Sequence, residues 1–289
     1  MKLSVFVVTY NQEQYIRQAL DSILMQQVNF DYEIIIGEDC STDSTPAICD
    51  EYAAKYSQIH LYHHTPNKGL IGNWEFVLNH CTGQYIAMLE GDDFWTDPHK
   101  LQKQVDFLDV HPDVALTFTS ANVLCEDGDT SDVHLFDHLQ EKYYTDNDIY
   151  AQWSILSSTV VFRNSPALPI KYPKELCIND TYTFLSIMKY GKAYCFTEKW
   201  TTYRRHASNI TKQNSREMSV RLANQHRYMG HAFPNVRGHA QRSEKTYLYE
   251  LCFDKSQKDT WKYRMRYIWL DKRLLFSRFA LSTIKYLFV

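Results

Sequence analysis

The sequence predicts an α/β fold with a mostly parallel central sheet flanked by helices, followed by a helical C-terminal extension. Short apolar runs rich in β-branched and aromatic residues alternate with segments of helical period over the first 110 residues, which is typical of strand–helix–strand units. Each run ends in polar residues, as expected where a parallel sheet forms a ligand site. Hydrophobic residues make up 44% of the 289 residues, which is enough for a full core.

The first half of the chain is expected to contain four strands and four helices. The strands are predicted at residues 4–8, 33–36, 59–63 and 85–89. The helices are predicted at residues 15–24, 46–56 and 70–81, and after Asp97-Pro98. Because parallel strands end at the same edge of a sheet, this order brings four polar segments to one place.

The second half of the chain is less regular. Strands are expected at residues 114–119 and 158–163, a helix at 180–189, and apolar pieces at 194–196 and 203–206. Residues 125–150 are polar and acidic, which indicates a loop with short helical pieces. Helical, basic and aromatic residues dominate after about residue 208, so we place a domain boundary there.

The segment of residues 261–289 is strongly basic. It carries seven basic residues and one acid, a balance of +6, although the whole chain has a net charge of −3. Apolar residues recur near helical spacing at 273–281, which suits an amphipathic helix on an anionic membrane. A helix that packs on the protein or in a dimer contact explains the pattern equally well. Nucleic acid is excluded as a partner, because the acidic remainder would repel a phosphate backbone.

Cysteine usage and hydropathy indicate the compartment. The seven cysteines are odd in number and lack metal-binding spacing, which favours reduced thiols in the cytoplasm. The apolar run at the N-terminus is too short for a signal peptide, and no run reaches the roughly 18 residues of a membrane span. We therefore expect a cytoplasmic protein, with residues 261–289 as the candidate for peripheral contact with the inner face of the cell membrane.

Three acidic residues directly follow the predicted strand at 85–89. They are Glu90, Asp92 and Asp93, with Gly91 between them. Carboxylates at the end of a buried strand suit Mn²⁺ or Mg²⁺ completed by substrate phosphates. Asp92 and Asp93 are the expected ligands, with Glu90 beside or behind them. A solvated turn before the helix at Asp97 is the alternative, and the polar ends of the other strands argue against it.

Asp39 follows the predicted strand at 33–36 and has two interpretations. An aspartate at a strand end can accept a hydrogen bond from a nucleotide base. The segment after it can also serve only to cap the helix that begins at Pro46, which is the favoured role for Ser41, Asp43 and Ser44.

Six segments in this order and spacing resemble glycosyltransferase family 2, the inverting enzymes of the GT-A fold. They are VTYN at 8–11, EDCSTDST at 38–45, NKG at 67–69 with Asn73, TGQYIAMLEGDD at 82–93, IND at 178–180 and YRRHASNIT at 203–211. The resemblance covers about residues 1–211. It implies a GT-A (nucleotide-diphospho-sugar transferase) domain at 1–207, with a nucleotide-sugar-binding half at 1–110 and an acceptor-side half at 111–207, before the extension at 208–289.

The resemblance also implies roles for individual residues. Residues implied to bind the donor are Thr9, Tyr10, Asn11, Asp39, Asn67, Lys68, Asn73, Glu90, Gly91, Arg204, Arg205 and His206. Asp39 would bind the base, typically uracil. The acidic segment matches the family's DXD motif, with Glu90 in place of the usual first aspartate. The metal ligands would be Asp92, Asp93 and His206.

Catalysis would depend on Asp180, which matches the family's general base. Asp180 could instead be only a helix cap, and Arg204, Arg205 and His206 could be ordinary surface or core residues. Trp95, next to the acidic segment, is the best candidate for stacking on an acceptor sugar, although a lone tryptophan is more often a core residue.

The predicted protein is an inverting, metal-dependent hexosyltransferase. It would move a sugar from a nucleotide-diphospho-sugar, in the first place a UDP-hexose, to a saccharide or lipid-linked acceptor in bacterial surface polysaccharide or lipopolysaccharide synthesis. A nucleotidyltransferase would need a glycine-rich basic loop after the first strand, and VTYNQEQYIRQ offers neither. An inactive nucleotide-sugar-binding or scaffold subunit remains the alternative, against which the presence of Asp92, Asp93 and Asp180 argues.

Overall fold

The computed structural model describes residues 1–126, 128, 130–164, 170–206, 209, 215–253, 260–274, 280 and 283. The chain divides into two compact units. The first comprises Met1–Tyr172 and Ile178–Ala207, and the second comprises Pro173–Cys177 and Ser208–Val289. The second unit therefore includes a short segment from the middle of the chain.

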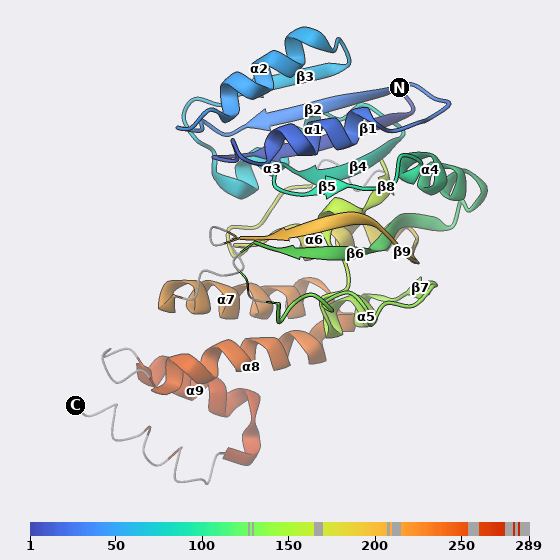
Figure 1. Ribbon diagram of the computed structural model, residues 1–289. Coiled ribbons are helices and arrows are strands. Elements are labelled where there is room, and N and C mark those ends of the chain that lie inside the picture. The colour runs from blue at the N-terminus through green and yellow to red at the C-terminus, as the bar shows by residue number, and fades with distance from the viewer. Residues whose placement is uncertain are drawn as a thin grey trace. The chain divides into compact units, whose positions relative to one another are not determined.

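A nine-stranded sheet forms the centre of the first unit (Figure 1). Its strands are β1 (Leu3–Thr9), β2 (Tyr32–Glu38), β3 (Ile59–His63), β4 (Tyr85–Glu90), β5 (Phe94–Trp95), β6 (Val114–Cys125), β7 (Lys142–Tyr144), β8 (Val161–Arg163) and β9 (Lys192–Arg205). Their order is β3-β2-β1-β4-β8-β6-β9-β5, with β7 paired to β9. Strands β1 to β4 pair in parallel, as do β6 and β9, whereas β5, β7 and β8 are antiparallel to their neighbours. The predicted α/β fold with a mostly parallel sheet is confirmed.

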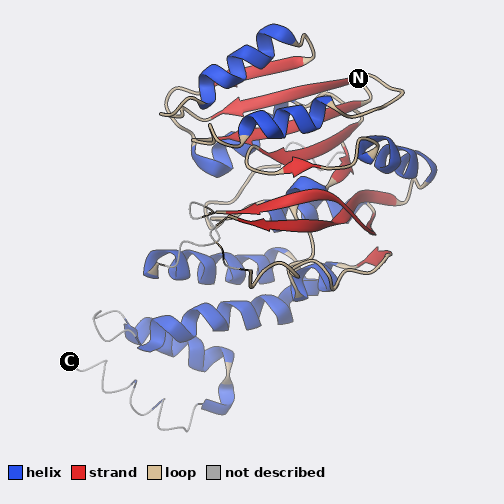
Figure 2. Ribbon diagram, viewed as in Figure 1, coloured by secondary structure: helices blue, strands red, loops and turns tan. Residues whose placement is uncertain are grey.

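Helices cover both faces of this sheet (Figure 2). They are α1 (Ile16–Leu24), α2 (Thr45–Lys55), α3 (Gly69–His80), α4 (Lys100–Val110), α5 (Asp146–Ala151) and α6 (Asp180–Ile187). Side chains alternate between the faces of a strand, so Val5 and Val7 of β1 pack in one core with α1 and α4, and Phe6 packs in the other with Trp74 of α3. Both faces of the sheet are buried at β1, which explains why this strand is apolar at most positions.

The predicted boundaries of the first four strands and four helices agree with the structure to within a few residues. The second half differs more. β8 begins only at Val161, because residues Ser157–Thr159 form a 3₁₀ turn. The pieces at 194–196 and 203–206 are both parts of the single strand β9. The loop expected at 125–150 contains β7 and α5.

The second unit is helical, with α7 (Arg216–Ala232), α8 (Arg237–Phe253) and α9 (Thr260–Leu270). Ala223 of α7 packs with Leu248 and Leu251 of α8 in a small apolar core. Most of the amphipathic segment predicted at 273–281 lies outside the described residues. In the described part of the chain, no helix combines the length and the apolar character that crossing a membrane requires.

Candidate functional site

The ends of β1, β2 and β4 bring the predicted polar segments together. In the register of the sheet, Thr9 lies opposite Glu38, and Val8 lies opposite Glu90. The strand ends are also joined by the backbone, because Asp39 N donates to Thr9 O at 3.1 Å and the amide of Gly91 donates to Val8 O. The edge predicted from strand order is therefore the edge that these residues share.

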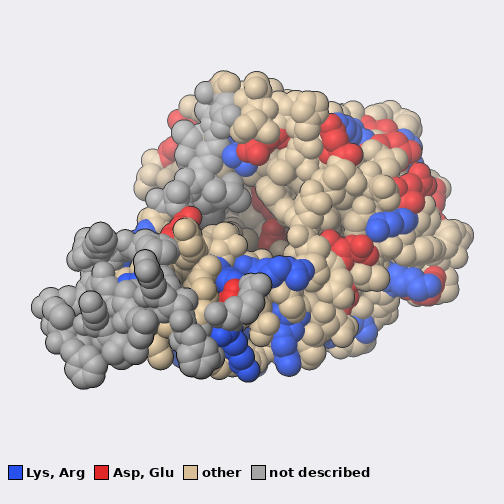
Figure 3. Space-filling model, turned by 90° about the horizontal axis from the view of Figure 1, so that it is seen from below, with Lys and Arg blue, Asp and Glu red and all other residues tan. Residues whose placement is uncertain are grey.

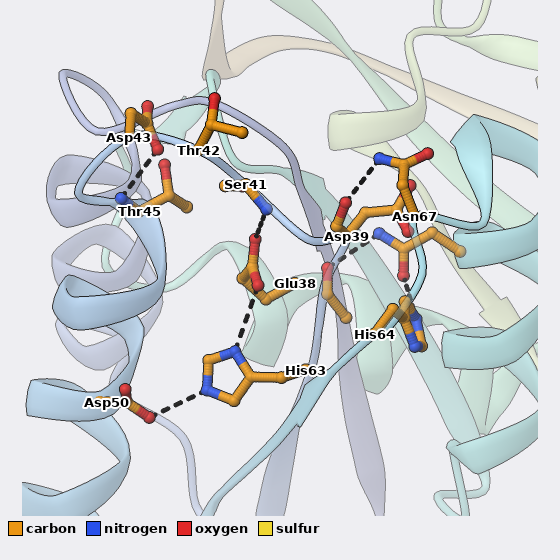
Figure 4. A network of polar contacts seen from close by, with 12 residues as sticks. Glu38, Asp39, Ser41, Thr42, Asp43, Thr45, Asp50, His63, His64 and Asn67 are labelled. Atoms are coloured by element: carbon orange, nitrogen blue, oxygen red, sulfur yellow. Dashed lines mark hydrogen bonds and ion pairs between the residues drawn. The ribbon is translucent and has the colours of Figure 1, made fainter.

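Asp39 is a buried carboxylate at this edge, 2% exposed (Figure 4). Its Oδ1 accepts a hydrogen bond from Lys68 N at 2.7 Å, and its backbone carbonyl accepts one from Asn67 Nδ2 at 2.5 Å. Asp39 therefore holds the turn after β3, and its Oδ2 accepts no hydrogen bond from the residues that the structure describes. That oxygen can accept a hydrogen bond from a nucleotide base. The side chain of Lys68 is exposed.

A histidine between two carboxylates supports the loop that carries Asp39 (Figure 4). His63 Nδ1 lies 3.2 Å from Glu38 Oε2, and its Nε2 lies 2.9 Å from Asp50 Oδ1. The other oxygen of Glu38 accepts from Ser41 N at 2.7 Å. Partial burial lowers the pKa of His63, but the bonds to Asp50 and Glu38 outweigh it and raise the pKa. Sequence analysis missed this network, because its members come from β2, α2 and β3.

Asn11 and Thr9 form hydrogen bonds within the protein. Asn11 Oδ1 accepts a hydrogen bond from Thr42 N at 2.8 Å, and Asn11 N donates to Ser41 Oγ at 2.9 Å. The buried Thr9 donates its hydroxyl hydrogen to Gln12 Oε1. A Cβ atom at Gly91 would lie 2.4 Å from that same Oε1 and 2.9 Å from Thr9 Oγ1, so a larger residue would displace this bonded pair. The neighbouring Tyr10 is 49% exposed and accessible to a ligand.

Asn73 bonds to other residues of the protein, and its predicted donor contact stays a prediction. Asn73 is 3% exposed on α3. Its Nδ2 donates to Gly37 O at 2.8 Å, and its Oδ1 lies 3.0 Å from His64 Nε2. The amide joins α3 to β2 within the core.

Trp95 is not an acceptor platform. Its side chain is 1% exposed, its indole N–H donates to Ser158 O at 2.8 Å, and Lys100 Nζ lies 4.5 Å from its ring centroid. Trp95 fills the core behind the acidic segment, which is the alternative that a lone tryptophan most often fulfils.

The three carboxyl groups of the acidic segment have different surroundings. Ser158 Oγ lies within hydrogen-bond distance of both Glu90 Oε2 and Asp93 Oδ2, and Ser157 Oγ bonds the other oxygen of Glu90. A serine hydroxyl has one hydrogen, so both contacts of Ser158 are satisfied when one of the two carboxyl groups is protonated. Burial raises the pKa of Glu90 to about 7 and raises that of Asp93 well above its usual range; the charge of Asp92 adds to both effects.

Asp93 therefore faces the protein and not a ligand. Its Oδ1 accepts from Arg204 N at 2.9 Å, its Oδ2 contacts Ser158, and the residue is 3% exposed. Both oxygens are engaged, so we leave Asp93 out of the candidate metal ligands. Glu90 bonds both serines in the same way and acts from behind the site.

Asp92 and His206 form a largely buried pair at the end of the acidic segment, with side chains 17% and 9% exposed. His206 Nε2 lies 3.1 Å from Asp92 Oδ2, and the imidazole packs beside the Tyr15 ring with centroids 4.9 Å apart. Within the described residues, no three His, Cys, Asp or Glu side chains are arranged to hold a metal ion. Mg²⁺ and related ions are commonly bound by one or two protein groups plus substrate phosphates. The pair fits an ion of that kind, and does not fit a cage made by the protein alone.

Arg204 is a structural residue and not a ready phosphate contact. Its Nε donates to Asp92 O at 2.9 Å, one terminal nitrogen donates to Gln18 Oε1 at 2.6 Å, and the other donates to Glu126 Oε1. The guanidinium also lies 4.7 Å from the Tyr15 ring centroid. These contacts occupy the guanidinium in three directions and favour a structural role, while the predicted diphosphate contact of Arg204 stays a prediction.

Arg205 is ion-paired with Asp132 at 2.6 Å. The contribution of Tyr15 and Glu126 to this region was missed, because only the folded chain brings them to β9. Residues 207, 208, 210 and 211 of the YRRHASNIT segment lie outside the described residues.

Asp180 is the first residue of α6. Its Oδ1 accepts hydrogen bonds from Thr181 N at 2.5 Å and from Thr181 Oγ1 at 3.3 Å. Burial raises the pKa of Asp180, and the bonds from Thr181 oppose this rise in part. A general base acts most effectively when its pKa is close to the working pH. The upward shift of the Asp180 pKa therefore suits that role.

Comparison with known proteins adds independent findings. The sequence model of glycosyl transferase family 2 matches residues 4–163. An uncharacterized protein of Mycobacterium tuberculosis (strain H37Rv) is 37% identical over 210 residues, which cover 72% of this chain and 60% of that protein. The chain thus spans less than two thirds of the length of this relative. The putative teichuronic acid biosynthesis glycosyltransferase TuaG of Bacillus subtilis is 32% identical over 203 residues, 70% of this chain and 78% of TuaG.

Two solved structures share the fold at low sequence identity. S. aureus TarS 1–349 in complex with UDP has a TM-score of 0.62 at 20% identity, covering 90% of this chain and 74% of TarS. The mannosyltransferase PcManGT from Pyrobaculum calidifontis, in complex with GDP-Man and Mn²⁺, has a TM-score of 0.57 at 17% identity, covering 99% of this chain and 84% of PcManGT.

Proposed function

The chain belongs to glycosyl transferase family 2, and we propose that it is an inverting, metal-dependent glycosyltransferase that acts in cell-surface polysaccharide synthesis. The donor would be a nucleotide-diphospho-sugar, in the first place a UDP-hexose, and the acceptor a saccharide or a lipid-linked saccharide. The observation that carries the proposal is the Asp92–His206 pair at the end of β4. Asp39 stands at the end of β2, a strand that pairs, like β4, with β1.

Each residue of the proposed donor site has a separate task. Asp39 Oδ2 would accept a hydrogen bond from the base, and the exposed Tyr10 would cover it. Asp92 and His206 would hold Mn²⁺ or Mg²⁺, and the ion, when bound, would stabilise the negative charge that grows on the departing diphosphate. Arg204 would keep the backbone of Asp92 in place. Arg205, Asn67 and Lys68 remain proposed donor contacts.

Asp180 would complete the reaction as general base. It would take the proton of the acceptor hydroxyl while that oxygen forms a bond to the anomeric carbon. The bond from this carbon to the phosphate oxygen breaks on the opposite side, which inverts the configuration. The raised pKa of Asp180, caused by burial, would favour proton uptake. One such base is sufficient for a single displacement.

The domain limits and location are part of the proposal. We assign residues 1–110 to donor binding, 111–207 to the acceptor side and 208–289 to the extension, in a cytoplasmic protein. Lys262, Met265 and Trp269 form one exposed stripe on α9, which supports peripheral contact with an anionic membrane. In flotation with phosphatidylglycerol vesicles, Met265→Ser/Trp269→Ser should reduce binding; equal flotation of variant and native protein would refute the contact.

Nucleotide binding tests the donor site. Calorimetry should show that UDP binds in the presence of Mn²⁺ and not in the presence of chelator, and that Asp92→Ala abolishes this binding. GDP and CDP identify the base preference. Asp106→Ala is the matched control, because Asp106 is an exposed aspartate on α4. If no nucleotide binds the native protein, the donor-site assignment is wrong.

Asp180→Asn separates an enzyme from an inactive nucleotide-sugar-binding or scaffold subunit. The substitution keeps the shape of the side chain and removes its basicity. Transferase turnover, followed as UDP release from UDP-sugars, should fall by about 10²- to 10⁴-fold while UDP affinity stays the same. Turnover that survives the substitution would exclude Asp180 as the base.

A further inference from the structure

A groove in the second unit lies outside the proposed donor site. It is lined by Lys174, Glu175, Arg221, Asn224, Arg227, Tyr228 and His231, and its volume is about 420 Å³. The loop of residues 173–177 is attached to α7, because Gln225 Oε1 accepts from Cys177 N at 2.7 Å and from Cys177 Sγ at 3.2 Å. Both walls of the groove therefore belong to one folded unit.

The groove is lined by three basic side chains, those of Lys174, Arg221 and Arg227. Lys174 and Arg221 are exposed, and neither makes an ion pair with any residue in the described part of the chain. Arg227 is oriented by Glu244, whose Oε1 accepts from Arg227 Nε at 2.8 Å. Glu175 is the single acid of the lining. On the face shown in Figure 3, lysine and arginine side chains gather on one part of the surface.

The buried Glu244 is shared between two arginines. It is fully buried, and it accepts from both Arg227 and Arg266. One carboxylate thus serves two guanidinium groups, so their joint charge is only half compensated. This arrangement fixes Arg227 in the lining and leaves the groove electropositive.

The remaining lining residues suit a carbohydrate. Asn224 and Tyr228 lie four residues apart and therefore on the same face of α7, between Arg221 and His231 in the sequence. An amide can bind sugar hydroxyls, and a half-buried tyrosine ring can cover the apolar C–H face of a sugar. Cations at the rim with polar and aromatic groups between them match a saccharide that carries anionic groups.

We propose that this groove binds an anionic saccharide, and that the acceptor of the transferase carries phosphate or carboxylate groups. The assignment to the acceptor rests on the proposed function. In sequence, the lining loop runs directly into the segment of Asp180, the proposed base. The groove would hold the acceptor by its charges and hydroxyls, apart from the site that takes the nucleotide.

Calorimetry on the full chain with defined probes tests the groove. The probes are trigalacturonate for carboxylates, a glycerol phosphate trimer for phosphates, and neutral maltotriose. One anionic trimer should bind more tightly than maltotriose, and which one binds identifies the anionic group. Lys174→Ser/Arg221→Ser should weaken that binding about tenfold, as expected for the loss of two charged contacts.

Arg242→Ser is the matched control, because Arg242 is an exposed arginine on α8 outside the groove. It should leave the affinity within about twofold. Equal losses in both variants, equal binding of maltotriose, or binding only to phosphatidylglycerol vesicles would each overturn the groove as a saccharide site. UDP affinity with Mn²⁺ is measured on the same samples. If the native protein binds an anionic trimer but does not bind UDP, the proposed function is refuted and the anion-binding groove remains.

Discussion

Replacement of Arg204 by alanine distinguishes a structural residue from a diphosphate contact. The Arg204 side chain is only 7% exposed, and its donors are directed to Asp92 O, Gln18 Oε1 and Glu126. Arg204→Ala removes all three hydrogen bonds and the packing on Tyr15. If this description is right, the protein without ligand should lose stability. An arginine whose main contact is with a bound diphosphate would contribute little to the stability of the unliganded protein.

The expected loss follows from the separate contacts. Hydrogen bonds from a charged donor contribute about 1.5–3 kcal/mol; the bond to Asp92 O is made by a buried side chain, whereas Gln18 is exposed. Glu126 is 33% exposed, so water screens that pair and its contribution is about 1 kcal/mol or less. Water can replace part of what is lost at Gln18, so we expect about 3 kcal/mol in all. For a unit of this size, that corresponds to a fall in Tm of about 6–12 °C.

Scanning calorimetry without nucleotide measures this fall, with Arg205→Ala as the matched control. Arg205 makes one ion pair with Asp132, between side chains that are 13% and 28% exposed, so its loss should lower Tm by about 4 °C at most. If Arg204→Ala leaves Tm no lower than Arg205→Ala and yet abolishes UDP binding, Arg204 is a direct diphosphate contact and the structural interpretation is refuted.

The pKa shifts of His63 and Lys100 predict opposite dependences of stability on pH. The pKa of His63 is raised, because its bonds to Asp50 and Glu38 outweigh partial burial; its stabilising effect is complete below about pH 6.5 and is lost as the pH rises through the folded-state pKa. In urea unfolding, His63→Gln should therefore cost about 1 kcal/mol at pH 5.5 and little at pH 9, and equal losses would contradict this. Burial lowers the pKa of Lys100 well below its usual range, so native stability should rise with pH toward about 10.4. The change in the free energy of unfolding caused by Lys100→Met should be about 1–2 kcal/mol more favourable at pH 6 than at pH 10. If this change is the same at both pH values, Lys100 is not neutral in the folded protein.

The fold could be predicted because it depends on repeating patterns. Alternation along β1 and the apolar spacing of α1 involve many residues at once, so single exceptions do not alter the result. Strand β9 was divided into two pieces, because its polar middle at Thr197–Lys199 interrupts the apolar pattern while backbone pairing with β6 continues on both sides. A two-residue strand such as β5 has no periodicity to detect.

Side-chain roles could be predicted only as far as the sheet edge determines them. Asp39 and Asp92 stand where the ends of parallel strands meet, and strand order alone places them there. Asn73 and Trp95 lie close in sequence to the site residues, but α3 and β5 turn them into the core. Their burial depends on partners such as Gly37 and Ser158, which are far away in the sequence, and no local pattern reports such partners.

The acidic segment shows how one distant residue can divide the work of three carboxyl groups. Glu90, Asp92 and Asp93 look alike in the sequence, and their clustering predicts a divalent ion bound by more than one of them. Ser158, on the turn before β8, contacts Glu90 and Asp93 and leaves Asp92 to His206. The repulsion among the three carboxyl groups is thus relieved mainly by a proton on one buried carboxyl group and by the hydrogen bonds with Ser158. A bound cation would have to compensate only the carboxylate of Asp92, which is why two protein ligands and a diphosphate can suffice.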